Sequence, residues 1–262
     1  MKNKIGLALG SGAFRGFAHI GVIQVLQENN IPISFISGTS VGALVAAYFA
    51  LYQDISGLEE AFLSSKKNFY RIADLGWRNG LVSATKYERF IEHLLGNKNF
   101  KDVKIPLQIL ATELATGNPY VFSSGKLATA VRASSSVPIV FESIKGKNGG
   151  FVDGALSSPV PVKELIDLGA DKVIAVNLYH KNEFIDKRFN LTKIALRSTR
   201  IVLYNLAQKS IENASTVINP DVSSQVQLTS VRNYFSRKLI DEMIQIGRRE
   251  TKKKIKEIKS WL

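Results

Sequence analysis

Gly38-Thr-Ser-Val-Gly42 lies between two apolar runs, residues 31–37 and residues 43–50. The first run suits a buried strand and the second begins a stretch of helical length, so the five residues predict a turn from a strand into a helix. Gly38 and Gly42 let the chain turn tightly and lift the Ser40 hydroxyl above the carboxyl end of a sheet. A serine that only caps the helix has the same pattern. The motif alone leaves a nucleophile and a helix cap as alternatives.

Strand and helix patterns alternate around this turn. Strands are expected at residues 4–9, 31–37, 104–112, 120–123, 151–152 and 172–177, and helices at residues 17–29, 41–52, 127–134 and 162–168. This alternation predicts an α/β fold, with a mainly parallel sheet and helices on both faces. Residues 53–96 have a mostly helical pattern.

The chain beyond residue 180 is expected to be mostly helical, with helices at residues 191–215 and from residue 235 to the end. We therefore expect a core, residues 1–180, and a helical C-terminal part, residues 181–262, packed on the same domain. The last residues of this part form a basic tail.

The composition narrows the classes of function. The chain has no cysteine, which excludes thiolate catalysis and cysteine-ligated metals and is compatible with a reducing compartment. No apolar stretch reaches the roughly 20 residues that span a bilayer, and the apolar run at residues 5–9 is too short for a signal peptide. We therefore expect a cytoplasmic protein. The formal net charge of +13 favours an anionic partner, either nucleic acid or a membrane surface.

A second glycine cluster, Gly10-Ser-Gly-Ala-Phe-Arg-Gly16, follows the first expected strand. Its third glycine comes one residue too late for a dinucleotide-binding fingerprint, and it lacks the Lys-Ser/Thr ending of a phosphate loop. The backbone N–H groups of such a strand-to-helix turn could hold an oxyanion, or the turn could serve packing alone. Arg15 could brace the loop, hold a phosphate or be an ordinary surface cation.

Asp153, in Phe151-Val-Asp-Gly-Ala155, stands at the end of a short expected strand, from which its carboxylate could reach a serine on a neighbouring strand end. A plain Asp-Gly turn is the alternative. A serine nucleophile also needs a base, and the chain holds three histidines, His19, His93 and His180. The first two fall within expected helices. The last alone follows both the serine and the aspartate, so it could complete a triad, or it could be a solvated loop residue.

In their order and separation, these three motifs resemble those of the patatin-like phospholipases. The resemblance covers roughly residues 5–180 and extends through residues 18–22, 111–117, 131–134, 137–138 and 168–171. It implies a patatin-like three-layer sandwich and a lipid acyl hydrolase with a Ser-Asp dyad, which needs no histidine and no metal or other cofactor. It assigns Ser40 as the nucleophile and Asp153 as its base.

The resemblance also places an oxyanion hole or substrate contact in the first glycine loop, at Gly10, Gly12, Ala13 and Arg15. In many members of the family the glycine run is uninterrupted, whereas Ser11 and Ala13 interrupt it here. Since an oxyanion hole uses backbone N–H groups, an alanine can still donate where its φ and ψ are allowed.

We therefore expect a serine acyl hydrolase that cleaves ester bonds of phospholipids or related lipids. The alternative is a non-catalytic patatin-fold regulator or a membrane-surface binding protein. Nucleic acid is not expected as a partner, because the basic run lacks interleaved aromatic residues apart from Trp261 and no recognition motif appears. The sequence does not indicate an oligomeric state.

About half of the positive excess lies beyond residue 231. On a helix, Ile255, Ile258 and Leu262 would form one apolar stripe with lysines around it. This pattern is typical of a helix that lies on an anionic membrane. Alternatively, the stripe packs on the body of the protein itself.

Overall fold

The computed structural model describes residues 3–64, 84–138, 149–184, 191–224 and 236–262, together with positions 141, 143, 144 and 146. Within these residues, seven strands form one sheet in the order β4-β3-β2-β1-β6-β7, and β5 also pairs with β3. The parallel strands are β1 (Ile5–Leu9), β2 (Phe35–Thr39), β3 (Leu107–Glu113), β6 (Lys172–Val176) and β7 (Thr216–Ile218). The strands antiparallel to β3 are β4 (Pro119–Phe122) and β5 (Phe151–Asp153).

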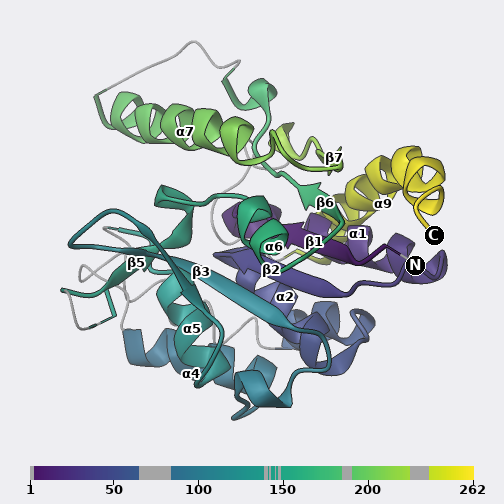
Figure 1. Ribbon diagram of the computed structural model, residues 1–262. Coiled ribbons are helices and arrows are strands. Elements are labelled where there is room, and N and C mark those ends of the chain that lie inside the picture. The colour runs from purple at the N-terminus through teal and green to yellow at the C-terminus, as the bar shows by residue number, and fades with distance from the viewer. Residues whose placement is uncertain are drawn as a thin grey trace.

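The sheet lies between two helical layers (Figure 1), and alternate residues of β1 belong to the core under one layer or the other. Ile5, Leu7 and Leu9 belong to the larger core, and Ala8 belongs to the smaller core on the other face. The larger core is covered by α1 (Phe17–Glu28), α2 (Val41–Tyr52), α4 (Ala84–Leu95), α5 (Leu127–Ser134) and α9 (Arg237–Lys259), and the smaller core by α6 (Val162–Asp167) and α7 (Leu191–Ser210). Successive side chains of a strand point to opposite faces, so a strand buried on both faces is apolar throughout. The predicted α/β fold is confirmed.

Two strands begin later than their apolar runs. β2 begins at Phe35 rather than at residue 31, and β3 begins at Leu107 rather than at residue 104. Pro32 and Pro106 interrupt the two runs, and proline has no N–H to donate to a strand ladder. The apolar pattern therefore located both strands but not their first residues.

The C-terminal part contains a strand that the sequence did not predict. The helix expected at residues 191–215 ends at Ser210, and β7 follows and pairs with β6. Earlier in the chain, residues 56–64 and α4 are helical as expected, whereas residues 65–83 of that expectation lie outside the described residues. None of the described helices is both long and apolar enough to cross a bilayer.

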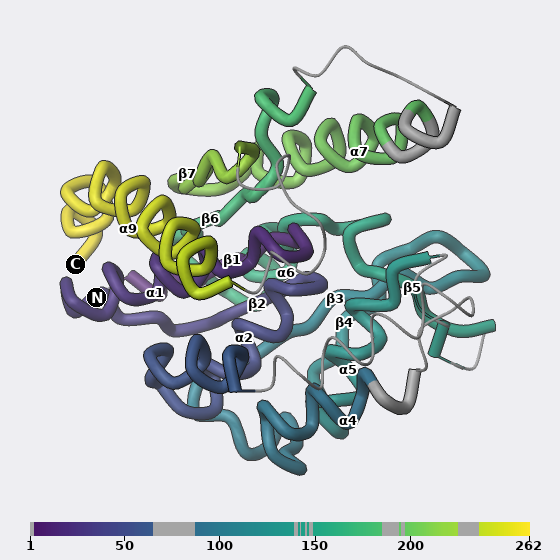
Figure 2. Tube along the Cα trace, turned by 180° about the vertical axis from the view of Figure 1, so that it is seen from behind, coloured from purple at the N-terminus to yellow at the C-terminus, as the bar shows by residue number. Residues whose placement is uncertain are grey.

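The helix α9 packs along α1, and the two run side by side in Figure 2. Their backbones lie so close together that two glycines are needed between them. A Cβ atom at Gly21 would lie 2.0 Å from the Ile244 carbonyl oxygen, and one at Gly247 would lie 2.1 Å from the Ala18 carbonyl oxygen. Ile258 is fully buried in the same core. Ile255 is partly buried against that core, whereas Leu262 is exposed. The tail therefore docks on the body of the protein through two of the three residues of its apolar stripe, and β7 and α9 both join the structure built by the first 180 residues.

Candidate active site

Ser40 stands on a strained turn between β2 and α2. Its backbone has φ 57° and ψ −121°, a conformation that a residue with a side chain rarely adopts. The flanking glycines make the turn possible: a Cβ atom at Gly38 would lie 2.4 Å from the Gly42 carbonyl oxygen, and one at Gly42 would lie 2.2 Å from that of Leu9. The turn therefore places the Ser40 side chain at the carboxyl edge of the sheet, as the motif predicts.

Asp153 ends β5, opposite Ala111 of β3. Its Oδ2 atom accepts a hydrogen bond of 2.8 Å from the Ser40 hydroxyl, and its Oδ1 atom accepts one of 2.9 Å from the Ala155 N–H. Close packing fixes the turn behind it, because a Cβ atom at Gly154 would lie 2.2 Å from the Leu110 carbonyl oxygen. The structure thus brings together the serine and the aspartate, which lie 113 positions apart.

Both side chains of this pair are buried, and burial changes the acidity of the aspartate. Burial raises the pKa of Asp153 to about 6, against the opposing effect of the hydrogen bonds from Ala155 and Ser40, which favour the ionised form. At neutral pH the carboxylate is therefore still mostly ionised. It is also a stronger base than an ordinary aspartate, whose pKa is about 3.9.

The hydroxyl of Ser134, the last residue of α5, contacts the turn at residues 38–42, which we call the elbow. It accepts a hydrogen bond of 2.7 Å from the Ser40 N–H and donates one of 2.5 Å to the Leu110 carbonyl. Ser134 falls in one of the stretches that match the patatin pattern, but its contacts could not be inferred from the chain alone. It fixes the backbone of Ser40 relative to β3.

The first glycine loop packs directly against this elbow. A Cβ atom at Gly42 would also lie 2.7 Å from the Gly10 carbonyl oxygen, and one at Gly16 would lie 2.2 Å from a methyl group of Val41. The Gly10 and Ser11 N–H groups donate to the carbonyls of Val176 and Pro159. Within the described part of the chain, the N–H groups of Gly12 and Ala13 donate to no backbone carbonyl.

Ala13 adopts φ 50°, a left-handed conformation that costs an alanine more than a glycine. Gly12 is confined as well, because a Cβ atom there would lie 2.7 Å from a methyl group of Leu178. The loop thus keeps a shape that leaves two amide donors available, as an oxyanion site requires.

His19 and Arg15 brace the loop through two different carbonyls. The fully buried His19 bonds to the Gly10 carbonyl through Nε2 at 2.8 Å, and burial lowers the pKa of His19 to about 4. The ring is therefore neutral at pH 7, with its proton on Nε2, because a carbonyl can only accept. The Arg15 Nε donates to the Gly12 carbonyl at 2.9 Å. Arg15 is buried, so its interpretation as an ordinary surface cation is wrong.

The contacts of His180 do not support a triad. A triad histidine must lie between the serine and the acid, but Ser40 and Asp153 bond directly at 2.8 Å. The His180 Nδ1 lies 3.5 Å from Asp221 Oδ2 and accepts from the Asn182 N–H. In this geometry the serine's direct partner is a carboxylate.

The fold and the elbow define an α/β protein with a buried serine-aspartate pair at the carboxyl edge of its sheet. The model of the patatin-like phospholipase family matches residues 7–166. This match covers more than half of the chain, and the chain therefore belongs to the patatin-like phospholipase family.

Sequence relatives come from bacteria, fungi and animals. An uncharacterized NTE family protein of Mycobacterium tuberculosis (strain ATCC 25618 / H37Rv) is 32% identical over 176 residues, which are 67% of this chain and 49% of the relative. The neuropathy target esterase sws of Drosophila melanogaster is 30% identical over 183 residues, which cover 67% of this chain and 13% of that protein. The chain therefore matches about half or less of the length of these relatives.

The fold is also similar to that of a solved structure. VipD from Legionella pneumophila aligns with a TM-score of 0.56 and 13% sequence identity, over 98% of this chain and 67% of that chain. At this level of identity the likeness concerns the fold alone.

Proposed function

We propose that this protein is a serine acyl hydrolase that cleaves ester bonds of phospholipids or related lipids. The observation that carries the proposal is the 2.8 Å hydrogen bond from the Ser40 hydroxyl to Asp153. Membership of the patatin-like phospholipase family supports the lipid substrate. So do the names of two relatives, a neuropathy target esterase of Drosophila melanogaster and a lysophospholipase NTE1 of Pyricularia oryzae, the latter 29% identical over 66% of this chain and 12% of its own length.

In the proposed reaction, Ser40 Oγ attacks the ester carbonyl carbon while its proton passes to Asp153. The N–H groups of Gly12 and Ala13 stabilise the negative charge on the carbonyl oxygen. Asp153 then returns the proton to the departing alcohol, which leaves an acyl ester on Ser40. A water molecule gives a proton to Asp153 as its oxygen attacks the acyl carbon. Asp153 returns this proton to Ser40 Oγ as the bond between Oγ and the acyl carbon breaks, so the fatty acid leaves with the serine restored.

A non-catalytic regulator of the same fold is supported less well. The Ser40 backbone is strained and the Asp153 carboxylate is buried, and both features cost stability. A protein that only binds gains nothing from a strained serine backbone or from a buried carboxylate. A hydrolase uses both, since the strained turn holds the nucleophile against its base and burial strengthens that base.

A fluorophosphonate is expected to label this protein at Ser40, at a rate that follows the ionisation of Asp153. Because burial raises the pKa of Asp153 to about 6, the rate should be nearly constant above pH 7 and fall about tenfold per unit well below pH 6. Peptide mapping and the rate of labelling between pH 4.5 and pH 8 check this. Ser40→Ala serves as the unlabelled control. A label on another residue, or a rate that does not change with pH, would contradict the proposal.

We also propose that α9 contacts an anionic membrane through charge alone. Lys252, Lys256 and Lys259 are exposed, while the apolar Ile258 is buried. Each cation near an anionic surface contributes about 1 kcal/mol, and salt screens this attraction. Replacing all three lysines by glutamate should therefore abolish most binding to phosphatidylserine vesicles at low salt, while hydrolysis of a soluble ester stays unchanged.

Vesicle sedimentation at several salt concentrations measures this binding. The matched control is a triple exchange to glutamate in the opposite layer, at Lys163, Arg200 and Lys209, which are also exposed. Equal losses in the two variants would mean that only the net charge of the protein matters and would overturn the assignment to α9.

A further inference from the structure

The orientation of the Gly12–Ala13 peptide is set by Arg15. The Gly12 carbonyl accepts two hydrogen bonds from Arg15, at 3.1 Å from the backbone N–H and at 2.9 Å from Nε. A trans peptide is planar, so its C=O and N–H point in opposite directions. Holding the Gly12 carbonyl therefore fixes the direction of the Ala13 N–H, one of the two donors of the proposed oxyanion site.

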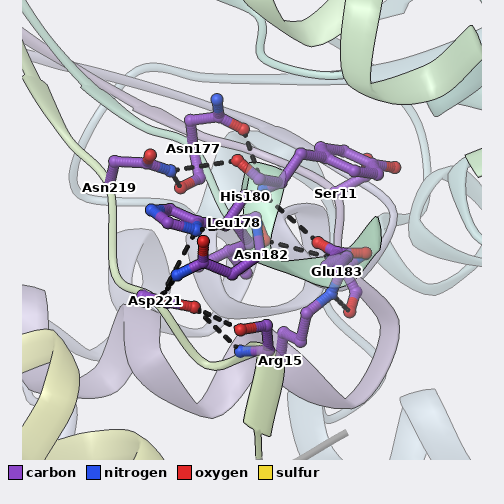
Figure 3. A network of polar contacts seen from close by, with 12 residues as sticks. Ser11, Arg15, Asn177, Leu178, His180, Asn182, Glu183, Asn219 and Asp221 are labelled. Atoms are coloured by element: carbon purple, nitrogen blue, oxygen red, sulfur yellow. Dashed lines mark hydrogen bonds and ion pairs between the residues drawn. The ribbon is translucent and has the colours of Figure 1, made fainter. Parts of the chain in front are cut away.

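The guanidinium of Arg15 is itself held by the segment that follows β6 (Figure 3). Its Nη1 donates to the Leu178 carbonyl at 3.1 Å and forms an ion pair with Glu183. The guanidinium carbon also lies 4.8 Å from the centre of the Tyr179 ring. All three contacts lie outside residues 7–166, which match the family.

Glu183 belongs to the short helix η4 (Lys181–Phe184), and its side chain is slightly more buried than that of its partner, with side-chain exposures of 8% for Glu183 and 11% for Arg15. Its Oε1 atom also accepts a hydrogen bond of 3.1 Å from the His180 N–H. Ion pairs in such surroundings are screened weakly by water. The loss of one partner is costly because it leaves the other charge buried and unpaired.

Further polar contacts anchor this segment to the chain that follows β7. The Asn219 side chain donates to the Tyr179 carbonyl at 3.2 Å, and the Asn182 side chain donates to Asp221 at 2.6 Å. The segment that carries Glu183 therefore contacts the glycine loop on one side, through Arg15, and the chain after β7 on the other.

We propose that Glu183 is a positioning residue of the oxyanion site, which acts through Arg15 on the Gly12–Ala13 peptide. By fixing the guanidinium, Glu183 keeps the Gly12 carbonyl in place and the Ala13 N–H directed at the developing oxyanion. The charge-assisted bond to the carbonyl also polarises the amide and strengthens its donor. This inference rests on the proposed function, since it assigns Glu183 a part in that same reaction.

Steady-state kinetics on a short-chain p-nitrophenyl ester test the role. Glu183→Gln keeps the size of the side chain but removes its charge, and it should lower kcat by about tenfold or more with KM changed less than about twofold, because the oxyanion forms only in the transition state. Asp221→Asn is the matched control. It loosens the same segment without touching Arg15, so kcat should stay within about twofold of the wild type.

Arg15 provides the second half of the test. Arg15→Met should lower kcat at least as much as Glu183→Gln, and the double variant should be no worse than Arg15→Met alone, since Glu183 acts through the arginine. Arg15→Lys keeps the charge but not the planar fork, so it should also lower kcat. If thermal melting shows that Glu183→Gln does not fold, the kcat of Arg15→Lys is measured in its place.

Three results would overturn the role of Glu183. These are a wild-type kcat in Glu183→Gln, equal losses in Glu183→Gln and Asp221→Asn, or additive losses in the double variant. Ser40→Ala, measured in parallel, separates this failure from a failure of the proposed function. If Ser40→Ala abolishes turnover and Glu183→Gln does not lower it, only the positioning role is lost.

Discussion

Replacing Ser40 by alanine is expected to lower the turnover of a soluble ester by about a hundredfold or more, and so is replacing Asp153 by asparagine. The first change removes the nucleophile. The second removes the base, because an asparagine amide cannot accept the serine proton. The two residues act as a unit joined by one hydrogen bond of 2.8 Å, so the double variant should be scarcely slower than either single variant.

The measurement is kcat/KM on a p-nitrophenyl ester, with circular dichroism to confirm that each variant folds. Asp171→Asn is a matched control, since this aspartate precedes β6 at the opposite end of the strands and accepts a bond from the Lys4 N–H. It should leave turnover unchanged. Strictly additive losses at Ser40 and Asp153 would make the aspartate structural, and an equal loss in a folded His180→Ala variant would restore the triad.

The parts of the site that the sequence predicts are those encoded by local spacing. A strand, a Gly-x-Ser-x-Gly turn and a helix follow one another without interruption, and the glycines at Gly38 and Gly42 are required by backbone contacts within the turn or with β1. In this case the covalent chain itself sets the geometry. For Asp153 the local pattern left a plain Asp-Gly turn as the alternative, and its assignment as the base came from the resemblance to the patatin-like phospholipases.

The supporting residues could not be predicted because their partners are distant in the chain. Ser134 bonds to the backbone of Ser40, which lies 94 positions away, and Glu183 pairs with Arg15, which lies 168 positions away. A serine at a helix end or a glutamate in a polar loop has many possible partners, and only the packing of the sheet selects one. His19 was missed for the same reason, since a histidine within a helical pattern does not indicate which carbonyl lies opposite it.

The limits of sequence patterns are also visible in the C-terminal part. The apolar stripe of α9 indicates a face that avoids water, but periodicity is the same whether a membrane or a neighbouring helix covers that face. In the structure a neighbouring helix covers this face, because Gly21 and Gly247 allow α1 and α9 to approach closely. The three residues of β7 are too few to show an alternating pattern, so this strand is recognisable only from its pairing with β6.

Gly42→Ala is expected to lower kcat by about a hundredfold or more, because it forces the elbow and the glycine loop apart. The new Cβ atom would lie 2.2 Å from the Leu9 carbonyl oxygen and 2.7 Å from that of Gly10, and both atoms belong to the backbone. Neither can rotate away as a side chain can. The shift must displace either Ser40 or the loop amides, and a misplacement of about 1 Å between reacting groups can cost about a hundredfold.

The control for this variant is Gly57→Ala, which adds the same methyl group. Its Cβ atom would lie 2.7 Å from the hydroxyl of Tyr48, the far end of a side chain that can move aside. Turnover of the soluble ester and the rate of fluorophosphonate labelling should therefore fall in Gly42→Ala and stay close to wild type in Gly57→Ala, both measured well below the melting temperature of each variant. If Gly42→Ala turned over the ester within about twofold of the wild type, the elbow and the glycine loop would be able to separate without loss of activity. The loop would then have no part in stabilising the oxyanion, since a donor fixed by contact with the elbow cannot remain aligned when that contact is broken.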